Sequence, residues 1–134
     1  MHTVRQLVEM GGEDLAVQVN VINACNMASR DAASKEVDQH FPDCIKWILT
    51  CYNMDAQLVF GDRIILSRMG FHQGDPLAGL LFSLVLQPII DRINAEVPTL
   101  KFNGWFLDDG TVVGTKEELQ RVVDIIKGSA LVHC

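Results

Sequence analysis

The sequence has few positive charges. Its 134 residues include 11 lysines and arginines against 17 aspartates and glutamates, which gives a formal net charge of −6. This balance excludes a free-standing basic nucleic-acid-binding domain, whose usual signature is a basic patch or a high pI. It leaves room for a nucleic-acid enzyme that lacks its basic flanking parts. Hydrophobic residues make up 49% of the chain, which is typical of a globular protein rather than a disordered one.

The four cysteines form no recognisable metal-binding or redox motif. No Cys-x-x-Cys pair is present, and no group of Cys and His has the spacing of a zinc site. Cys44 and Cys51 fall in one predicted helix, roughly 10 Å apart along its axis, which is too far for a disulfide. We therefore expect reduced cysteines and an intracellular protein, nuclear or cytoplasmic.

No hydrophobic run approaches the length of a membrane span. The most apolar stretch, residues 77–90, contains Ser83, Gln87 and Pro88 and falls short of the roughly 20 residues required. The N-terminus lacks a basic segment followed by an apolar run, so no signal peptide is expected. We expect residues 77–90 to form a buried core helix, and we expect no membrane partner.

Hydrophobic periodicity and turn signals predict an α+β fold. Helices are expected over residues 3–10, 29–39, 42–52, 76–90 and 115–126, and strands over residues 15–21, 57–60, 63–67, 101–107 and 111–114. Ser29 is predicted to cap the second of these helices, and Thr115 the last one, in a capping box with Glu118.

The predicted connections complete this arrangement. A two-residue turn is expected at Gly61-Asp62, a tight turn at residues 108–110, and a loop at residues 23–26. The length of the chain suits a single domain over residues 1–134. The order of elements predicts an antiparallel sheet that carries helices on one side.

The sharpest local feature is a pair of adjacent carboxylates, Asp108 and Asp109, between apolar strands. Two like charges in contact repel each other, so the pair is costly unless a cation lies there. Mg²⁺ prefers carboxylate oxygens as ligands. Taken alone, the motif is better explained as an ordinary Asp-Asp-Gly turn, because Asp and Gly are both favoured in turns.

A second feature is Gln73-Gly74-Asp75-Pro76-Leu77, at the beginning of the long apolar helix. Gly74 would let another molecule approach the backbone closely, and the unpaired N–H groups of a helix N-terminus favour phosphate. Taken alone, this motif is better explained as a polar helix start, with Asp75 and Pro76 as helix-initiating residues.

Three motifs follow one another in a specific order. Val19-Asn20-Val21-Ile22-Asn23-Ala24-Cys25-Asn26 comes first, Gln73-Gly74-Asp75-Pro76-Leu77 second, and Phe106-Leu107-Asp108-Asp109-Gly110 third. Over residues 15–126 this order resembles the palm of reverse transcriptases, most closely those of eukaryotic non-LTR retrotransposons. The resemblance implies a polymerase palm, with a ferredoxin-like β-α-β-β-α-β core and an added hairpin, without fingers and thumb.

The resemblance also implies a function and a set of site residues. A palm of this family carries out RNA-directed DNA synthesis, a nucleotidyl transfer on two divalent cations, Mg²⁺ or Mn²⁺. Asp108 corresponds to the metal-binding aspartate of the hairpin and Asp109 to its neighbour. Gln73 and Gly74 correspond to the loop that shapes the pocket for nucleotide and template, and Phe106 holds a position that is Tyr or Phe. The implied partners are an RNA template, a DNA primer and deoxynucleotides.

Two positions depart from the family pattern, which resembles Asp-x-x-Asn-Ala-Phe-Asn in the first motif. Asn20 replaces the aspartate that bridges both metals, and an amide offers one carbonyl oxygen without negative charge. We expect weak metal binding and a loss of roughly a thousandfold or more in rate. In the family this position holds an aromatic residue, whose ring excludes the 2′-hydroxyl of a ribonucleotide. Cys25 is much smaller, so we expect that exclusion to be lost. Cys25 can also be a small buried hydrophobe.

Two functions from different classes remain open. One is a reverse transcriptase palm, and the other is a degenerate or domesticated palm remnant that binds a cation or another protein without catalysis. The substitutions at Asn20 and Cys25 favour a non-catalytic remnant. The preserved motifs favour descent from a reverse transcriptase palm. A nucleotide-binding module unrelated to polymerases would lack a Gly-rich phosphate loop. Without basic flanks we expect weak nucleic-acid binding, and uncovered apolar surfaces predict self-association.

Overall fold

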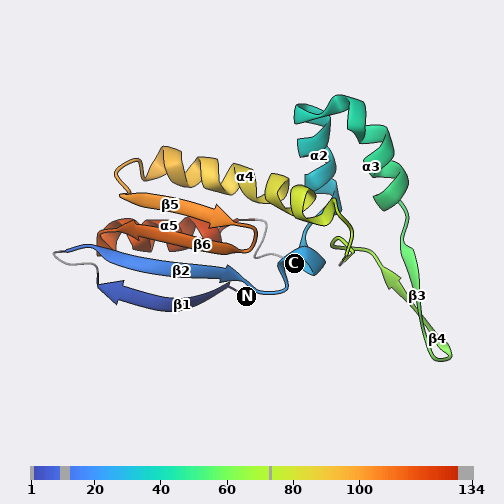
Figure 1. The fold of residues 1–134 in the computed structure, drawn as a ribbon, viewed down its shortest axis with the longest axis horizontal. Helices are drawn as coiled ribbons and strands as arrows, with labels where there is room; N and C mark the ends of the chain where they lie inside the picture. The colour runs from blue at the N-terminus through green and yellow to red at the C-terminus, as the bar shows by residue number, and fades with distance from the viewer. Residues whose placement is uncertain (1, 10–12, 73, 130–134) are drawn as a thin grey trace. The chain divides into compact units, whose positions relative to one another are not determined.

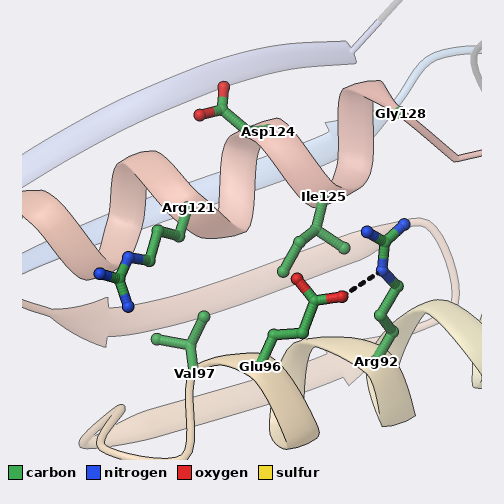
Figure 2. Close-up of a pocket in the computed structure, with 7 residues that line it drawn as sticks. All are labelled: Arg92, Glu96, Val97, Arg121, Asp124, Ile125 and Gly128. Carbon is green, nitrogen blue, oxygen red and sulfur yellow. Dashed lines mark hydrogen bonds and ion pairs between the residues drawn. The ribbon is translucent and has the colours of Figure 1, made fainter.

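The computed structural model describes residues 2–9, 13–72 and 74–129 (Figure 1). Their helices and antiparallel sheets confirm the predicted α+β class. In chain order the elements are β1 His2–Glu9, β2 Leu15–Val21, α1 Ala24–Met27, α2 Arg30–His40, the 3₁₀ turn η1 Pro42–Cys44, α3 Ile45–Tyr52, β3 Ala56–Phe60, β4 Arg63–Ser67, α4 Ala78–Glu96, β5 Phe102–Phe106, β6 Asp109–Gly114 and α5 Lys116–Lys127. The chain divides into two compact units, one formed by Met1–Asn23 with Leu86–Cys134 and the other by Ala24–Val85.

The first unit contains a four-stranded antiparallel sheet in the order β1-β2-β6-β5. Alternate residues of β2 and β6 turn to one face and pack against α5 and the end of α4, as the period of two predicts. Thr115 caps α5 in the predicted capping box. The buried core of this unit consists of Val17, Val19, Ile93, Val97, Val112, Leu119, Val122, Ile125 and Ile126.

The prediction of a helix over residues 3–10 is wrong, because His2–Glu9 forms strand β1. In the sequence, Val4, Leu7 and Val8 have the i, i+3, i+4 spacing of a helix face. The strand contains a register shift between Val4 and Gln6, and such a bulge breaks the period of two that identifies a strand. Pairing with β2 then satisfies the backbone groups on the side of the segment that faces β2. Gly11 and Gly12, which follow this segment and would suit the end of a helix, lie outside the described residues.

The second unit contains α1, α2, α3, the β3–β4 hairpin and the first part of α4. Ser29 caps α2 as predicted, its hydroxyl accepting a hydrogen bond from the N–H of Ala32 at 3.2 Å. The predicted loop at residues 23–26 is wrong, because Ala24–Met27 forms the helix α1. Four residues are too few for an isolated helix to persist. The Cys25 carbonyl accepts a hydrogen bond from the distant Phe71 N–H at 2.7 Å, which stabilises this turn of helix.

The sequence predicts the position of one hairpin turn correctly and misplaces the other. Gly61-Asp62 is the turn between β3 and β4, as predicted. The turn between β5 and β6 is Leu107-Asp108 rather than residues 108–110, because Asp109 already pairs with Phe106 in the ladder. Gly110 lies inside β6, where a Cβ atom would meet the Trp105 ring at 2.6 Å. Packing against that ring, rather than the turn, therefore requires the glycine.

The long apolar segment forms α4, which continues through Pro88. Leu81, Phe82 and Ile93 are fully buried, so the predicted core helix is confirmed. Across the described part of the chain, we find no helix with the length and apolarity needed to cross a bilayer.

Candidate functional site

The sheet face opposite the helices is polar at the end of β2. Val17 and Val19 turn toward the core, so Gln18 and Asn20 turn to the other face. In the antiparallel register Gln18 lies opposite Thr111 and Asn20 lies opposite Asp109. These strands form a pocket of about 210 Å³, lined by Gln18, Val19, Asn20, Asp109, Gly110 and Thr111.

Asn20 and Asp109 are in direct contact across the ladder. The side-chain Nδ2 of Asn20 donates a hydrogen bond to Oδ1 of Asp109 at 2.7 Å, although the two residues are 89 positions apart in the sequence. The half-buried Asp108 occupies the neighbouring turn, and its backbone carbonyl accepts a hydrogen bond from the Val21 N–H at 2.9 Å. That bond holds the turn against the end of β2, and it brings the Asp108–Asp109 pair beside the first motif.

Phe106 completes this end of the sheet. It is the last residue of β5 and lies opposite Asp109 in the register. Its side chain is 79% exposed, which is high for a phenylalanine. Four of the seven site residues suggested by the sequence, Asn20, Phe106, Asp108 and Asp109, therefore lie together in the first unit.

The donors at this site are oxygen atoms that suit a hard cation. Asp109 supplies a carboxylate and Asn20 the single carbonyl oxygen Oδ1, and the adjacent Asp108 carries a second carboxylate. Among the residues that the structure describes, no group of three His, Cys, Asp or Glu side chains could hold a metal ion. Together these side chains could offer a cation two carboxylates and one amide oxygen, whose charge of −2 balances one Mg²⁺ or Mn²⁺ but not two.

Of the other three predicted site residues, Cys25 and Gly74 belong to the second unit. Cys25 lies in α1 and is half-buried, and Gly74 lies just before α4. Gly74 has φ +91°, and a Cβ atom there would meet nothing within 4 Å. This glycine thus adopts a conformation that other residues rarely take, in open space. Gln73 lies outside the described residues.

An arginine that the sequence did not single out ties down the loop before Gly74. The Arg30 guanidinium donates hydrogen bonds from Nε to the Gly70 carbonyl at 2.8 Å and from Nη1 to the Ser67 carbonyl at 3.1 Å. The Gly70 N–H in turn donates to the Ala28 carbonyl at 2.9 Å. The only signal in the sequence is that an arginine carries five N–H donors, and this does not identify the loop whose carbonyl groups accept from it.

Tyr52 and Asp75 hold the other end of the same loop. The Tyr52 hydroxyl donates a hydrogen bond to the Asp75 carboxylate, whose Oδ1 also accepts from the Leu77 N–H at 2.8 Å. The second bond confirms Asp75 as a helix-initiating residue. The His72 ring stacks on the Tyr52 ring with centroids 5.6 Å apart. The sequence did not suggest the bond from Tyr52, although a buried hydroxyl in an apolar segment requires a partner.

These contacts shift the acidity of both groups. Burial, followed by the hydrogen bond to Asp75, raises the pKa of Tyr52 to about 12. The hydrogen bonds from Tyr52 and from the Leu77 N–H lower the pKa of Asp75. The folded protein therefore keeps the phenol protonated at pH values where an unfolded chain, with the ordinary pKa of 10.0, would lose the proton.

We expect Tyr52→Phe to lower the free energy of unfolding at neutral pH by about 1.5–3 kcal/mol, because a hydrogen bond to a carboxylate is lost. Wild-type stability should also fall as the pH rises from 10.0 to about 12, and the variant should lack this component. Urea unfolding across this range measures both effects. Tyr52 is the only tyrosine in the sequence, so phenolate absorbance reports its pKa alone. An absorbance midpoint near the ordinary value would contradict the buried hydrogen bond.

Comparisons with protein-family models, curated proteins and solved structures found no match to this chain.

Proposed function

We propose that this chain is a reverse transcriptase-like palm, built for template-directed nucleotidyl transfer with divalent cations, in which Asn20 leaves the metal site incomplete. The observation that carries the proposal is the 2.7 Å hydrogen bond from Asn20 to Asp109. It joins the first and third motifs at one end of the sheet, with Asp108 in the adjacent turn. An ordinary Asp-Asp-Gly turn would not explain why the first motif lies beside it.

The sheet order supports the same proposal. A ferredoxin-like β-α-β-β-α-β core sets its first and third strands side by side, with the second strand beyond the third. Here β2 lies beside β6, and β5 lies beyond β6. The helices α4 and α5 follow β2 and β6 in the chain, and β3–β4 would be the added hairpin. In such a core the fourth strand lies beside the first. Here β1, which precedes the other strands in the chain, takes that position beside β2.

The donor set explains why we expect weakened chemistry. When bound, divalent cations in such a site lower the pKa of the attacking hydroxyl and stabilise the leaving pyrophosphate. Asp108 and Asp109 can bind a cation, but one oxygen of Asp109 already accepts the Asn20 amide. Asn20 brings no charge to balance a second cation. The residues present thus favour one weakly held cation over two.

We expect the purified chain to show no primer extension on an RNA template with Mg²⁺ and deoxynucleotides. Loss of the bridging carboxylate should slow the reaction by roughly a thousandfold or more, and a chain with a net charge of −6 should hold nucleic acid weakly. A gel-based extension assay measures this. Extension that disappears in Asp108→Ala would show that the site is active and would contradict the expected inactivity.

A second candidate function is a non-catalytic remnant that binds a cation or another protein. The hydrogen bond between Asn20 and Asp109 favours it, because the Asn20 amide engages a carboxylate oxygen that a bound cation would need. The two candidates differ in the extension assay. A chain that binds Mn²⁺ through Asp108 and Asp109 yet never extends a primer, even with Asn20→Asp, would be such a remnant.

A further inference from the structure

The β3–β4 hairpin exposes an unusual amount of apolar surface. Six large apolar side chains on its two strands are between 42% and 77% exposed: Leu58, Val59, Phe60, Ile64, Ile65 and Leu66. Together they leave on the order of 600 Å² of apolar surface open to water, as much as the largest patch on a typical monomer. A two-stranded hairpin is at best marginally stable alone in water. This hairpin therefore needs a cover.

The outer edge of β4 is free to accept another strand. Within the described residues, β4 pairs with β3 alone. Gly61 has φ +62° at the first turn position, which suits a two-residue hairpin turn. In such a hairpin the residues next to the turn form a hydrogen-bonded pair, so alternation directs the backbone groups of Ile64 and Leu66 to the open edge. Neither lysine nor proline, the usual protection of natural edges, is present in β4.

We propose that β4 pairs antiparallel with β4 of a second copy of this chain, about a two-fold axis at Ile65. This register pairs all five strand residues and places Ile64 opposite Leu66 of the partner subunit. Since those two positions direct their backbone groups outward, they can exchange hydrogen bonds on both sides of the axis. The two hairpins would then form one four-stranded sheet with an isologous interface.

Charge complementarity favours this register and a second copy as the occupant. Pairing about Ile65 places Asp62 opposite Arg68 of the partner subunit at each end of the interface. Arg68 is 68% exposed and already lies 3.0 Å from Asp55, so it can be shared between two carboxylates. The corresponding pairing of β3 about Leu58 would place Asp62 opposite a methionine, Met54, with no charge gained.

The available area predicts the strength of the dimer. A standard stable interface buries roughly 800 Å² on each partner, somewhat more than this hairpin exposes. The dimer should therefore be weak and should dissociate on dilution. This inference does not depend on the proposed function, because it uses neither the metal site nor the loop at Gly74.

Sedimentation velocity of the full chain over a wide range of concentration tests the proposal. We expect the mass to rise from 14.9 kDa toward twice that value. Ile64→Pro removes an N–H from the β4 edge and should raise the dissociation constant about tenfold or more. The matched control is Val59→Pro, which removes the equivalent N–H from the β3 edge and should leave the dissociation constant unchanged.

A charge variant keeps the test decisive if a proline unfolds the hairpin. Asp62→Arg lies in the turn and leaves both strands intact, but it places like charges opposite each other at both ends. We expect weaker association that is partly restored by salt. A monomer at every concentration would overturn the proposal. So would an equal effect of the two proline variants, or association that survives both Ile64→Pro and Asp62→Arg, since either indicates another surface or another partner.

Discussion

Asn20→Asp is expected to tighten Mn²⁺ or Mg²⁺ binding by at least about tenfold, because it would place a second carboxylate beside Asp109. The two side chains lie directly opposite each other in the ladder. Without metal, the same change replaces a 2.7 Å hydrogen bond by two like charges and should destabilise the fold by about 1–2 kcal/mol. Metal should then stabilise the variant more than the wild type. Calorimetric titration and thermal unfolding, each with metal and with chelator, measure these effects.

The matched control is Gln18→Glu. Gln18 lies on the same sheet face, two residues before Asn20 in β2, opposite Thr111 rather than opposite a carboxylate. It adds the same charge to the same surface, so it separates specific ligation from general attraction of cations. Equal tightening of metal binding by Gln18→Glu and Asn20→Asp would contradict the proposed metal site at Asp109. So would the absence of any change in metal binding in both variants.

Gly70→Ala is expected to destabilise the second unit by about 3–5 kcal/mol. Gly70 has φ +72°, and a Cβ atom there would lie 2.3 Å from the Asn26 backbone carbonyl oxygen. Backbone atoms cannot move aside without breaking the hydrogen bonds that Gly70 makes with Ala28 and Arg30. Urea unfolding followed by circular dichroism measures the loss.

The control for this variant is Gly61→Ala in the exposed hairpin turn. Gly61 also has a positive φ, +62°, but a Cβ atom there would meet nothing within 4 Å. Gly61→Ala therefore measures only the cost of a positive φ in a residue other than glycine, roughly 1–2 kcal/mol, without a steric clash. Equal losses in the two variants would show that the contact between Gly70 and Asn26 does not form.

Features fixed by neighbours in the sequence could be predicted. Ser29 caps α2 through a bond to a residue three positions away, and Thr115 with Glu118 forms a capping box of the same span. Gly61-Asp62 forms a hairpin turn because glycine tolerates positive φ. Each depends on residues within one turn of chain, where side-chain chemistry and backbone conformation are directly linked.

Features fixed by distant partners could not be predicted in this way. The helix α1 depends on a bond to Phe71, and the Arg30 contacts depend on a loop about 40 positions away. Asp109 lies in a strand rather than a turn because it pairs with Asn20, which is 89 positions away in the sequence. Spacing alone carries no record of such contacts.

The candidate site lies between these two cases. Neither the Asp108–Asp109 pair nor Asn20 identifies a site by local pattern, and no periodicity places them together. The resemblance of three ordered motifs to a palm suggested their proximity, and the register of β2 with β6 sets Asn20 opposite Asp109. Phe106 was suggested in the same way, but its high exposure became evident only in the structure.

The most direct test of the palm proposal is a Mn²⁺ titration of the isotopically labelled wild-type chain, observed through paramagnetic broadening of backbone amide signals. At substoichiometric metal we expect the amides of Asn20, Asp108 and Asp109 to broaden first, because those residues share one end of the sheet. Glu117 and Glu118, adjacent acidic residues at the start of α5, provide the comparison. Broadening that begins there, or that spreads evenly over acidic residues, would contradict a metal site at the end of β2.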